Sequence, residues 1–455
     1  MGLWDNIKQK LTGTESAEKD LALNPVPLEK RESWLGPATV YAGVEFSFTV
    51  VMTGAALASG FSIGQVVLLI IIALVVITWI GDSINAYLGA KTGLSGTVIA
   101  RQSLGSIQAR IIASLSVLIM MIGWWAVNTA LVANAFCVAF GIDYTQQFGP
   151  WAIMVIIMGI IFMAPALLGF TSMKLFDYLA VPAGLLIFGF GIYLSVKAHG
   201  ITEIFQWAPQ QTMTWSTAIS TILGLNICQW VMISDYSRLH RPILKDSILM
   251  PSLIVVVGFV EILIGAIMAV GIGTTTFDII QVMVVLGYPF WAYLLLFIAQ
   301  WTSQIVSVYS AGLSLGNMFN TEDLRTQKLL TLSIGVIGII LALAGILNRF
   351  MDFLLLLGIL FAPLAAVMAV DFFFLRKQKW EDIKGWNLMA TITLVLGILI
   401  GYYFQYVNPF GIAAVQSYIL TGIVYYVLMR VKAAVAPDNF TPESWKTHIS
   451  KASIK

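Results

Sequence analysis

Twelve long apolar runs divide the chain, and shorter polar segments separate them. A transmembrane helix needs about 20 consecutive, mostly apolar residues, so each run predicts one crossing of a membrane. The predicted spans are 37–59, 65–88, 110–138, 150–169, 178–196, 214–234, 249–272, 287–315, 329–347, 350–375, 387–405 and 411–431. Aromatic residues at their ends, such as Trp34 and Trp151, are typical of the membrane–water interface.

The basic residues predict the orientation of these spans. Of the 25 lysines and arginines, only Lys197 and Arg349 lie in one alternate set of gaps, and the other 23 lie in the remaining gaps and the two tails. Cytoplasmic loops carry the excess of Lys and Arg. We therefore expect a multi-pass protein of the plasma (inner) membrane with a cytoplasmic N-terminal tail (1–36) and a cytoplasmic C-terminal tail (432–455).

Composition agrees with this pattern. The mean hydropathy is +0.88 and charged residues make up 11%, against about 25% in soluble proteins. The first 31 residues are polar, so we expect no cleaved signal peptide, and the first apolar run stays as a span. A net charge of +2 gives no reason to expect a nucleic-acid partner; the expected surroundings are a lipid bilayer.

An internal repeat is indicated by two similar patterns. A semi-polar stretch, 89–109, precedes the long third span, and another, 273–286, precedes the long eighth span. A five-span unit repeated after an odd number of crossings must be inverted, which is typical of transporters. We therefore expect inverted repeats at 37–196 and 214–375, followed by two extra helices at 387–431.

The first helix of each half is expected to be broken. Span 1 is interrupted at Gly43-Val44-Glu45-Phe46-Ser47, and span 6 at Gly224-Leu225-Asn226. Unwound backbone inside a bilayer is tolerated only where protein or a cavity satisfies it. In transporters such breaks form the binding site near the midplane.

Span 3 contains Trp124 and Asn128, which are four residues apart and therefore lie on one helical face. An indole beside an amide suits a flat, polar aromatic ligand that stacks on one and hydrogen-bonds to the other. The alternative is a packing tryptophan and an asparagine that bonds to a neighbouring helix. The two residues alone leave both possibilities open.

Span 8 contains the polar run Thr302-Ser303-Gln304, preceded by Ala299. Hydroxyl and carbonyl oxygens are the ligands that hard cations prefer, and the carbonyls of Gly43 and Phe46 in the broken span could complete a sodium site. The hydroxyls could instead bond back to carbonyls of their own helix.

Three of the carboxyl groups within spans are candidates for a role. Glu45 lies at the break of span 1, where it could relay a proton, oppose a cationic group or cap the adjacent half-helix. Asp82, near one end of span 2, is expected to be structural. Glu261 lies in the middle of span 7, and its role stays open.

Nothing in the sequence indicates an enzyme. Cys137 and Cys228 are isolated in apolar runs and are expected to pack as small residues. The three histidines are far apart, and no nucleophile or metal-ligand cluster stands out. We expect no cofactor beyond a coupling ion.

Four motifs in order resemble the nucleobase:cation symporter-1 family. The loop Gly89-Ala90-Lys91-Thr92-Gly93-Leu94-Ser95, continuing to Ala100-Arg101-Gln102-Ser103-Leu104-Gly105, is similar to a loop motif of that family. Asp235-Tyr236-Ser237-Arg238 is similar to its Asp-aromatic-Ser/Thr-Arg motif. Gly123-Trp124 and the hydroxyl pair of span 8 also fit, so the resemblance extends from Pro37 through span 12.

The resemblance implies a fold and a function. It implies an all-α polytopic membrane protein with the LeuT-type fold, in which twelve helices contain a five-plus-five inverted repeat. It also implies a secondary active transporter that imports a nucleobase or related heterocycle of the cytosine/purine class, coupled to sodium or protons, and that works as a monomer.

The resemblance further assigns roles to single residues. Sodium would lie at Gly43, Phe46, Ala299, Thr302 and Ser303. The ligand would stack on Trp124, hydrogen-bond to Asn128, Asn226 and Gln304, and be enclosed by Phe46, Ser47 and Phe48.

The chain departs from the family pattern at two places. Members often carry an aromatic residue in the break of the sixth helix. The matching position of this chain is Asn226, and Trp230 follows one turn later. Either Asn226 hydrogen-bonds to the ligand or Trp230 stacks on it. Glu45 is also unusual beside the cation-binding segment; it could favour a protonated or amine-bearing base, or indicate proton coupling.

Other classes of function stay open. One is a LeuT-type carrier for another small solute, such as an amine, an amino acid or a thiamine-precursor pyrimidine. A carboxylate-binding carrier would show a Gly-rich break in helix 1, which residues 44–47 do not resemble. The other is a channel or a non-transporting receptor. A channel needs a continuous polar pore lining, whereas the polar residues here gather at mid-depth.

Overall fold

The computed structural model describes residues 23–163, 170–209, 213–273, 278–321, 323–443 and 445, and the side chains among these except at 44, 170–181, 302, 305, 306, 324, 325, 327, 328 and 331. These residues are helical, without a strand; a single backbone bridge joins Glu32 to His240. Most of the two predicted tails lies outside the described residues.

The described residues of the first half of the chain form fifteen helical elements. In order they are η1 (Leu28–Lys30), α3 (Leu35–Glu45), α4 (Phe48–Leu57), α5 (Ile63–Ile70), η2 (Ile71–Thr78), α6 (Trp79–Thr92), α7 (Gly96–Ile99), α8 (Arg101–Leu104), α9 (Ser106–Gln108), η3 (Ala109–Ala113), α10 (Ser114–Ala139), α11 (Phe148–Met163), α12 (Phe170–His199), α13 (Ile201–Phe205) and α14 (Trp215–Asn226).

The described residues of the second half of the chain form twelve further elements. They are α15 (Gln229–Ser237), α16 (Leu244–Leu249), α17 (Ser252–Val270), α18 (Ile279–Val285), α19 (Phe290–Phe319), α20 (Leu324–Leu343), η5 (Ile346–Arg349), α21 (Phe350–Val370), η6 (Asp371–Leu375), α22 (Leu388–Tyr402), η7 (Tyr403–Val407) and α23 (Ala413–Val435).

These elements agree with the predicted membrane spans. Within the described residues, eight helices are long and apolar enough to cross a membrane, one further span is the bent pair α3–α4, and three shorter apolar helices lie at Phe148–Met163, Phe290–Trp301 and Leu332–Leu343. One of these falls in each of the twelve predicted spans. The ends differ slightly: the first span begins at Leu35, and the last continues to Val435, four residues into the predicted C-terminal tail.

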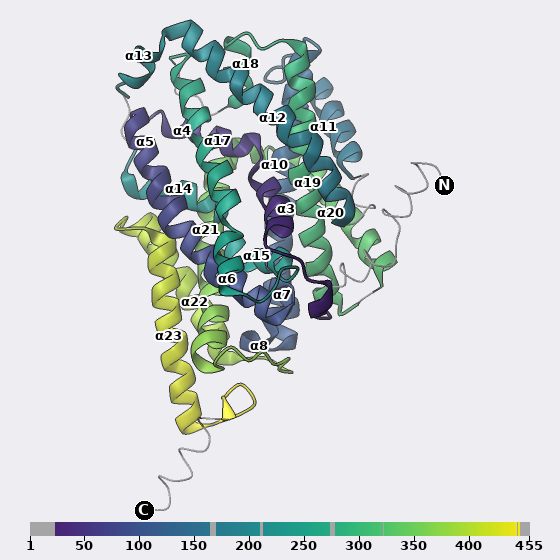
Figure 1. Cartoon of the computed structure of the whole chain (residues 1–455), viewed down its shortest axis with the longest axis vertical. Coiled ribbons are helices and arrows are strands. Elements are labelled where there is room, and N and C mark those ends of the chain that lie inside the picture. The colour runs from purple at the N-terminus through teal and green to yellow at the C-terminus, as the bar shows by residue number, and fades with distance from the viewer. Residues whose placement is uncertain are drawn as a thin grey trace, which may run out of the picture.

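The first span is broken between α3 and α4, and α3 lies in the middle of the bundle (Figure 1), against α12, α15, α17 and α19. α4 packs on α17, α10 packs on α19, and α15 packs on α6. The last two long helices, α22 and α23, pack on each other and on α21 at one side of the molecule. α13 and α18 lie at one end of the bundle, and α7 and α8 lie at the other.

The cation-rich loops meet at the end that holds α7 and α8. Arg101 donates hydrogen bonds to Asn317 (2.7 Å) and Asn320 (3.0 Å) and forms an ion pair with Asp382 (3.3 Å). The N-terminal segment joins this end, because the N–H of Val26 donates to Gly93 O at 2.9 Å. Loops that are far apart in the sequence are therefore tied together at one face.

Two of the sequence motifs contact each other. The N–H of Gly96 donates to Asp235 Oδ1 at 3.0 Å, so the loop motif is held by the motif that follows the sixth span. A Cβ on Gly96 would lie 2.0 Å from Val231 O, and one on Gly89 would lie 2.2 Å from Ser237 Oγ. Both glycines are needed because α15 approaches the loop so closely.

Candidate functional site

The broken first span changes direction at Phe46 and Ser47. α3 ends at Glu45, α4 begins at Phe48, and the two half-helices differ in direction by 64°. Ser47 is extended (φ −149°, ψ 137°), and its side chain accepts a hydrogen bond from the N–H of Thr49, as expected of an N-cap serine. The break falls within the predicted 43–47 segment.

Neighbouring helices satisfy the backbone freed by this break. The N–H of Ser47 donates to Glu261 Oε2 on α17 at 3.2 Å, and the N–H of Phe48 donates to Gln300 Oε1 on α19 at 3.2 Å. Gln300 Nε2 also donates to Ser47 Oγ at 2.9 Å. Unpaired backbone groups in a bilayer are costly, so Glu261 and Gln300 explain how the break persists.

The predicted break of the sixth span at 224–226 is wrong, because Trp215–Ser237 is one continuous span. α14 runs through Gly224 to Asn226, and the two turn residues that follow, Ile227 and Cys228, keep right-handed helical angles. Gly224 lies inside the helix, where a Cβ would be 2.4 Å from Leu354 O on α21. Its glycine is therefore explained by close packing of two helices and not by a break.

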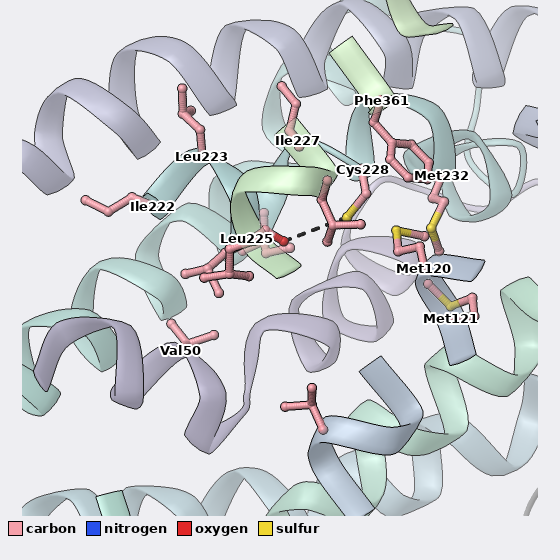
Figure 2. Packing of buried hydrophobic residues seen from close by; sticks show 14 of the residues in the cluster. Val50, Met120, Met121, Ile222, Leu223, Leu225, Ile227, Cys228, Met232 and Phe361 are labelled. Carbon is pink, nitrogen blue, oxygen red and sulfur yellow. Dashed lines mark hydrogen bonds between the residues drawn. The ribbon is translucent and has the colours of Figure 1, made fainter. Parts of the chain in front are cut away.

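A small cavity lies between the break of the first span and the middle of the sixth span. Its volume is about 40 Å³, far below the roughly 300–1,000 Å³ of pockets for drug-sized ligands. Its lining residues are Glu45, Ser47, Thr49, Val50, Met121, Trp124, Asn128, Leu225, Cys228, Gln229, Met232, Ser303 and Ser307. Figure 2 shows part of the apolar lining: Leu225 lies next to Cys228, and Met232 lies close to Met120 and Met121.

The indole of Trp124 borders this cavity and is held from α21. The rings of Phe353 and Phe350 meet it edge-on, at centroid distances of 5.4 and 6.1 Å. The preceding Gly123 makes room, because a Cβ there would lie 2.5 Å from Phe353 Cε2. Asn128 lines the same cavity, so the predicted pair does share one face of α10.

Glu45 and Asn226 form a polar pair beside the cavity. Asn226 Nδ2 donates to Glu45 Oε1 at 3.1 Å, and both side chains are buried. Asn226 itself is not among the lining residues, whereas Glu45 is. Trp230 turns away: it packs edge-on against Tyr418 of α23 and beside Gly81 of α6. Of the two alternatives for the sixth span, neither side chain lines the cavity directly.

Three other predicted ligand contacts lie outside the cavity lining. Gln304 Nε2 donates to Trp125 O (3.2 Å) and Thr129 Oγ1 (3.1 Å) within the helix packing. The rings of Phe46 and Phe48 pack on Phe188, at 5.6 and 5.4 Å. Ser47, the residue between them, does line the cavity.

Two members of the predicted sodium site meet at the break. Ser303 Oγ donates to Phe46 O at 3.1 Å, which brings α19 to the end of α3. Ala299 lies one turn earlier on the same face of α19 and is buried, as is Gly43. The side chain of Thr302 lies outside the described residues. A hydroxyl and a backbone carbonyl oxygen thus converge, which is the type of donor set a hard cation takes.

Two other polar side chains within the spans are Asp82, which is hydrogen-bonded, and Gln229, which lines the cavity. Asp82 Oδ2 accepts a hydrogen bond from the hydroxyl of Tyr41 at 3.0 Å, which agrees with the expected structural role. Gln229 lines the cavity but was not among the predicted ligand contacts. Its signal in the sequence is an amide three residues after Asn226, at the start of α15.

Comparisons with known proteins agree with this architecture. The family described as permeases for cytosine/purines, uracil, thiamine and allantoin matches residues 25–425. The cytosine permease of Escherichia coli is 25% identical over 422 residues, covering 91% of this chain and 95% of the relative. The allantoin permease of Bacillus subtilis is 24% identical over 458 residues, covering 90% and 92%.

Solved structures show the same fold. Mhp1, a nucleobase-cation-symport-1 family transporter, is similar in its closed conformation with bromovinylhydantoin bound (TM-score 0.76, 18% identity, 94% of this chain and 98% of the other). Its inward-facing conformation has a TM-score of 0.77 at 20% identity, with the same coverage. A Na⁺-coupled sialic acid symporter has a TM-score of 0.63 at 17% identity, covering 93% and 95%. The predicted LeuT-type helical fold is confirmed.

Proposed function

The chain belongs to the family of permeases for cytosine/purines, uracil, thiamine and allantoin, and we propose that it imports a nucleobase or related heterocycle by alternating access. It is a multi-pass membrane transporter of the nucleobase type and not an enzyme. Our proposals concern the direction of transport, the residues that contact the ligand and the identity of the coupling ion.

The observation that carries the proposal is the place of Trp124. Its side chain borders a mid-bundle cavity between the broken first span and the sixth span, together with the polar side chains of Glu45, Asn128 and Gln229. Aromatic faces stack on heterocycles, and amide or carboxyl groups bind their edges. A ring that stacks on Trp124 would have its edge within reach of these groups.

The small cavity supports alternating access. A space of about 40 Å³ is far below the roughly 300–1,000 Å³ of ligand pockets, so helices must separate before a heterocycle can enter. α21 contacts Trp124 through Phe350 and Phe353, so a shift of α21 would release the Trp124 ring. We assign the two repeats to 37–196 and 214–375; the first helix of the first repeat is broken between α3 and α4.

We propose sodium as the coupling ion, bound between α3 and α19 by Gly43, Phe46, Ala299, Thr302 and Ser303. The contact of Ser303 Oγ with Phe46 O supports this assignment. An ion that ties α19 to the break favours the conformation that also shapes the cavity. Cation and substrate would then raise each other's affinity by the same factor.

We also propose that both termini face the cytoplasm. The loops that contain Arg101, Arg238 and Arg376 lie at one end of the bundle, linked by contacts such as Arg101 with Asp382. The excess of basic residues at this end supports its cytoplasmic placement. Accessibility of a cysteine introduced at Lys30 to a membrane-impermeant reagent, in intact and opened cells, tests this assignment.

The test of function is binding to the purified full-length protein, followed by uptake in proteoliposomes. A panel of cytosine, adenine, hypoxanthine, uracil, allantoin and hydroxymethylpyrimidine would be measured with and without sodium by thermal shift and tryptophan fluorescence. Stabilisation by one compound that increases with sodium supports both assignments. Stabilisation that is the same with and without sodium contradicts sodium coupling. The absence of a response to every compound contradicts the proposed substrate class.

Proton coupling predicts a different result. If Glu45 carries the coupled proton, Glu45→Gln should change the pH profile of uptake and leave its sodium dependence as it was. If sodium is the coupled ion, uptake should follow the sodium gradient at constant pH in both proteins.

A further inference from the structure

The cavity next to Trp124 contains a carboxyl group with no cationic partner. Glu45 is 3% exposed and lines the cavity. Its Oε1 accepts one hydrogen bond, from Asn226, and the described residues donate none to its Oε2. No Lys, Arg or His is among the lining residues. Carboxylates at membrane depth are costly unless paired, so this group indicates a missing positive or hydrogen-bond-donating partner.

Two amides line the cavity beside Glu45. Asn128 Oδ1 and Gln229 Oε1 are buried acceptors without a hydrogen-bond partner in the described structure. Buried polar groups are normally paired. An amide can accept through its oxygen or, after rotation of the side chain, donate through its nitrogen, whereas a carboxylate only accepts. Glu45 is therefore the group that distinguishes a ligand with N–H donors from one with carbonyl groups.

We infer that the substrate is an amino-substituted heterocycle whose amidine edge, an exocyclic amino group beside a ring nitrogen, pairs with the Glu45 carboxyl. This rests on the proposed function, because it places the ring on Trp124. One proton lies between the ring nitrogen and Glu45, and the amino group donates to the second carboxyl oxygen. Such two-point pairing with a carboxylate is strong and directional, as for arginine.

The same geometry disfavours oxo-substituted rings. Replacing the amino group by a carbonyl places an acceptor against the second carboxyl oxygen of Glu45, where the amino group would have donated. Sites built to hydrogen-bond to a substrate N–H or O–H reject analogues that lack it far more strongly than apolar pockets reject a missing methylene. Specificity would therefore come from repulsion of the oxo analogue as much as from attraction of the amino one.

A competing role for Glu45 must be separated from this one. Glu45 directly precedes Phe46, whose carbonyl oxygen accepts a hydrogen bond from Ser303. The carboxylate could therefore balance the charge of sodium instead of binding the substrate. In that case its removal would weaken sodium binding and lower the affinity for every substrate equally.

Matched pairs of ligands distinguish the two roles. Cytosine against uracil and adenine against hypoxanthine differ by one amino-for-oxo change on the same ring. Dissociation constants for each pair would be measured on full-length protein at saturating sodium. We expect the amino member of at least one pair to bind tenfold or more tightly, and Glu45→Gln to reduce that ratio to within about threefold. Gln229→Leu, which keeps Glu45, should weaken both members alike and preserve the ratio, because an amide can either donate or accept.

The outcomes are distinct. Equal affinities within both pairs, or a preference for the oxo members, overturn the inference and leave the proposed function in place. A ratio that survives Glu45→Gln while both affinities fall also overturns it and assigns Glu45 to sodium. If no heterocycle binds, the proposed function fails and this inference falls with it. Should Glu45→Gln not fold, the wild-type ratios and Gln229→Leu still decide.

Discussion

Glu261 Oε2, in the middle of α17, accepts a hydrogen bond at 3.2 Å from the backbone N–H of Ser47, at the break between α3 and α4. A carboxyl group on one helix therefore stabilises the unwound backbone of another. Together with Gln300, which accepts from the N–H of Phe48, it sets the position of the break. This contact gives Glu261 a structural role in shaping the cavity.

Glu261→Leu should destabilise the protein, because it leaves the N–H of Ser47 buried without an acceptor. The cost of such a group is about 1–3 kcal/mol. Glu261→Gln is the matched control, since its amide oxygen can still accept. Thermal unfolding in detergent should show a lower midpoint for Glu261→Leu than for Glu261→Gln. Equal midpoints would mean that this hydrogen bond does not hold the break.

Trp124→Ala should weaken substrate binding by roughly 5- to 150-fold, the equivalent of about 1–3 kcal/mol for stacking of a base on an aromatic ring. Trp124→Phe should lose less, because it retains an aromatic face. Trp386→Ala, a tryptophan on the surface, is the control for general effects of tryptophan removal. Saturable uptake that is normal in Trp124→Ala protein would rule out stacking.

Ser303→Ala should raise the sodium concentration needed for half-maximal substrate binding by about tenfold, because it removes an oxygen from the proposed cation site. A charge-assisted contact of this kind is worth roughly 1.5–3 kcal/mol. Ser314→Ala, a buried serine further along α19, is the control on the same helix. The site assignment is wrong if the two variants respond to sodium alike.

Gly96→Ala should reduce the yield of folded protein and lower its unfolding temperature. The added Cβ would meet Val231 O at 2.0 Å and push the loop away from α15, with loss of the hydrogen bond to Asp235. Gly64→Ala on α5 has open space around the new methyl group and should be neutral or slightly stabilising. Similar unfolding temperatures for both variants would contradict close packing at Gly96.

The sequence alone determined the spans well, and one of the two predicted breaks. Runs of about 20 apolar residues are long enough to be recognised individually. The break of the first span falls at Phe46 and Ser47, inside the predicted 43–47 segment, whereas the sixth span continues through the predicted break at 224–226. That Trp124 and Asn128 share a face also followed from the sequence, because residues four apart do so on any helix.

Only the tertiary structure decided which faces meet. Gln304 and Trp230 turn toward neighbouring helices, at Trp125 and Tyr418, whereas Gln229 turns toward the cavity. Periodicity sets the angle between residues on one helix but not the rotation of that helix against its neighbours. In a bilayer, apolar residues surround most helices, so no polar stripe reveals that rotation. Close approaches at Gly96, Gly224 and Gly123 fix it instead, through contacts between residues far apart in the sequence.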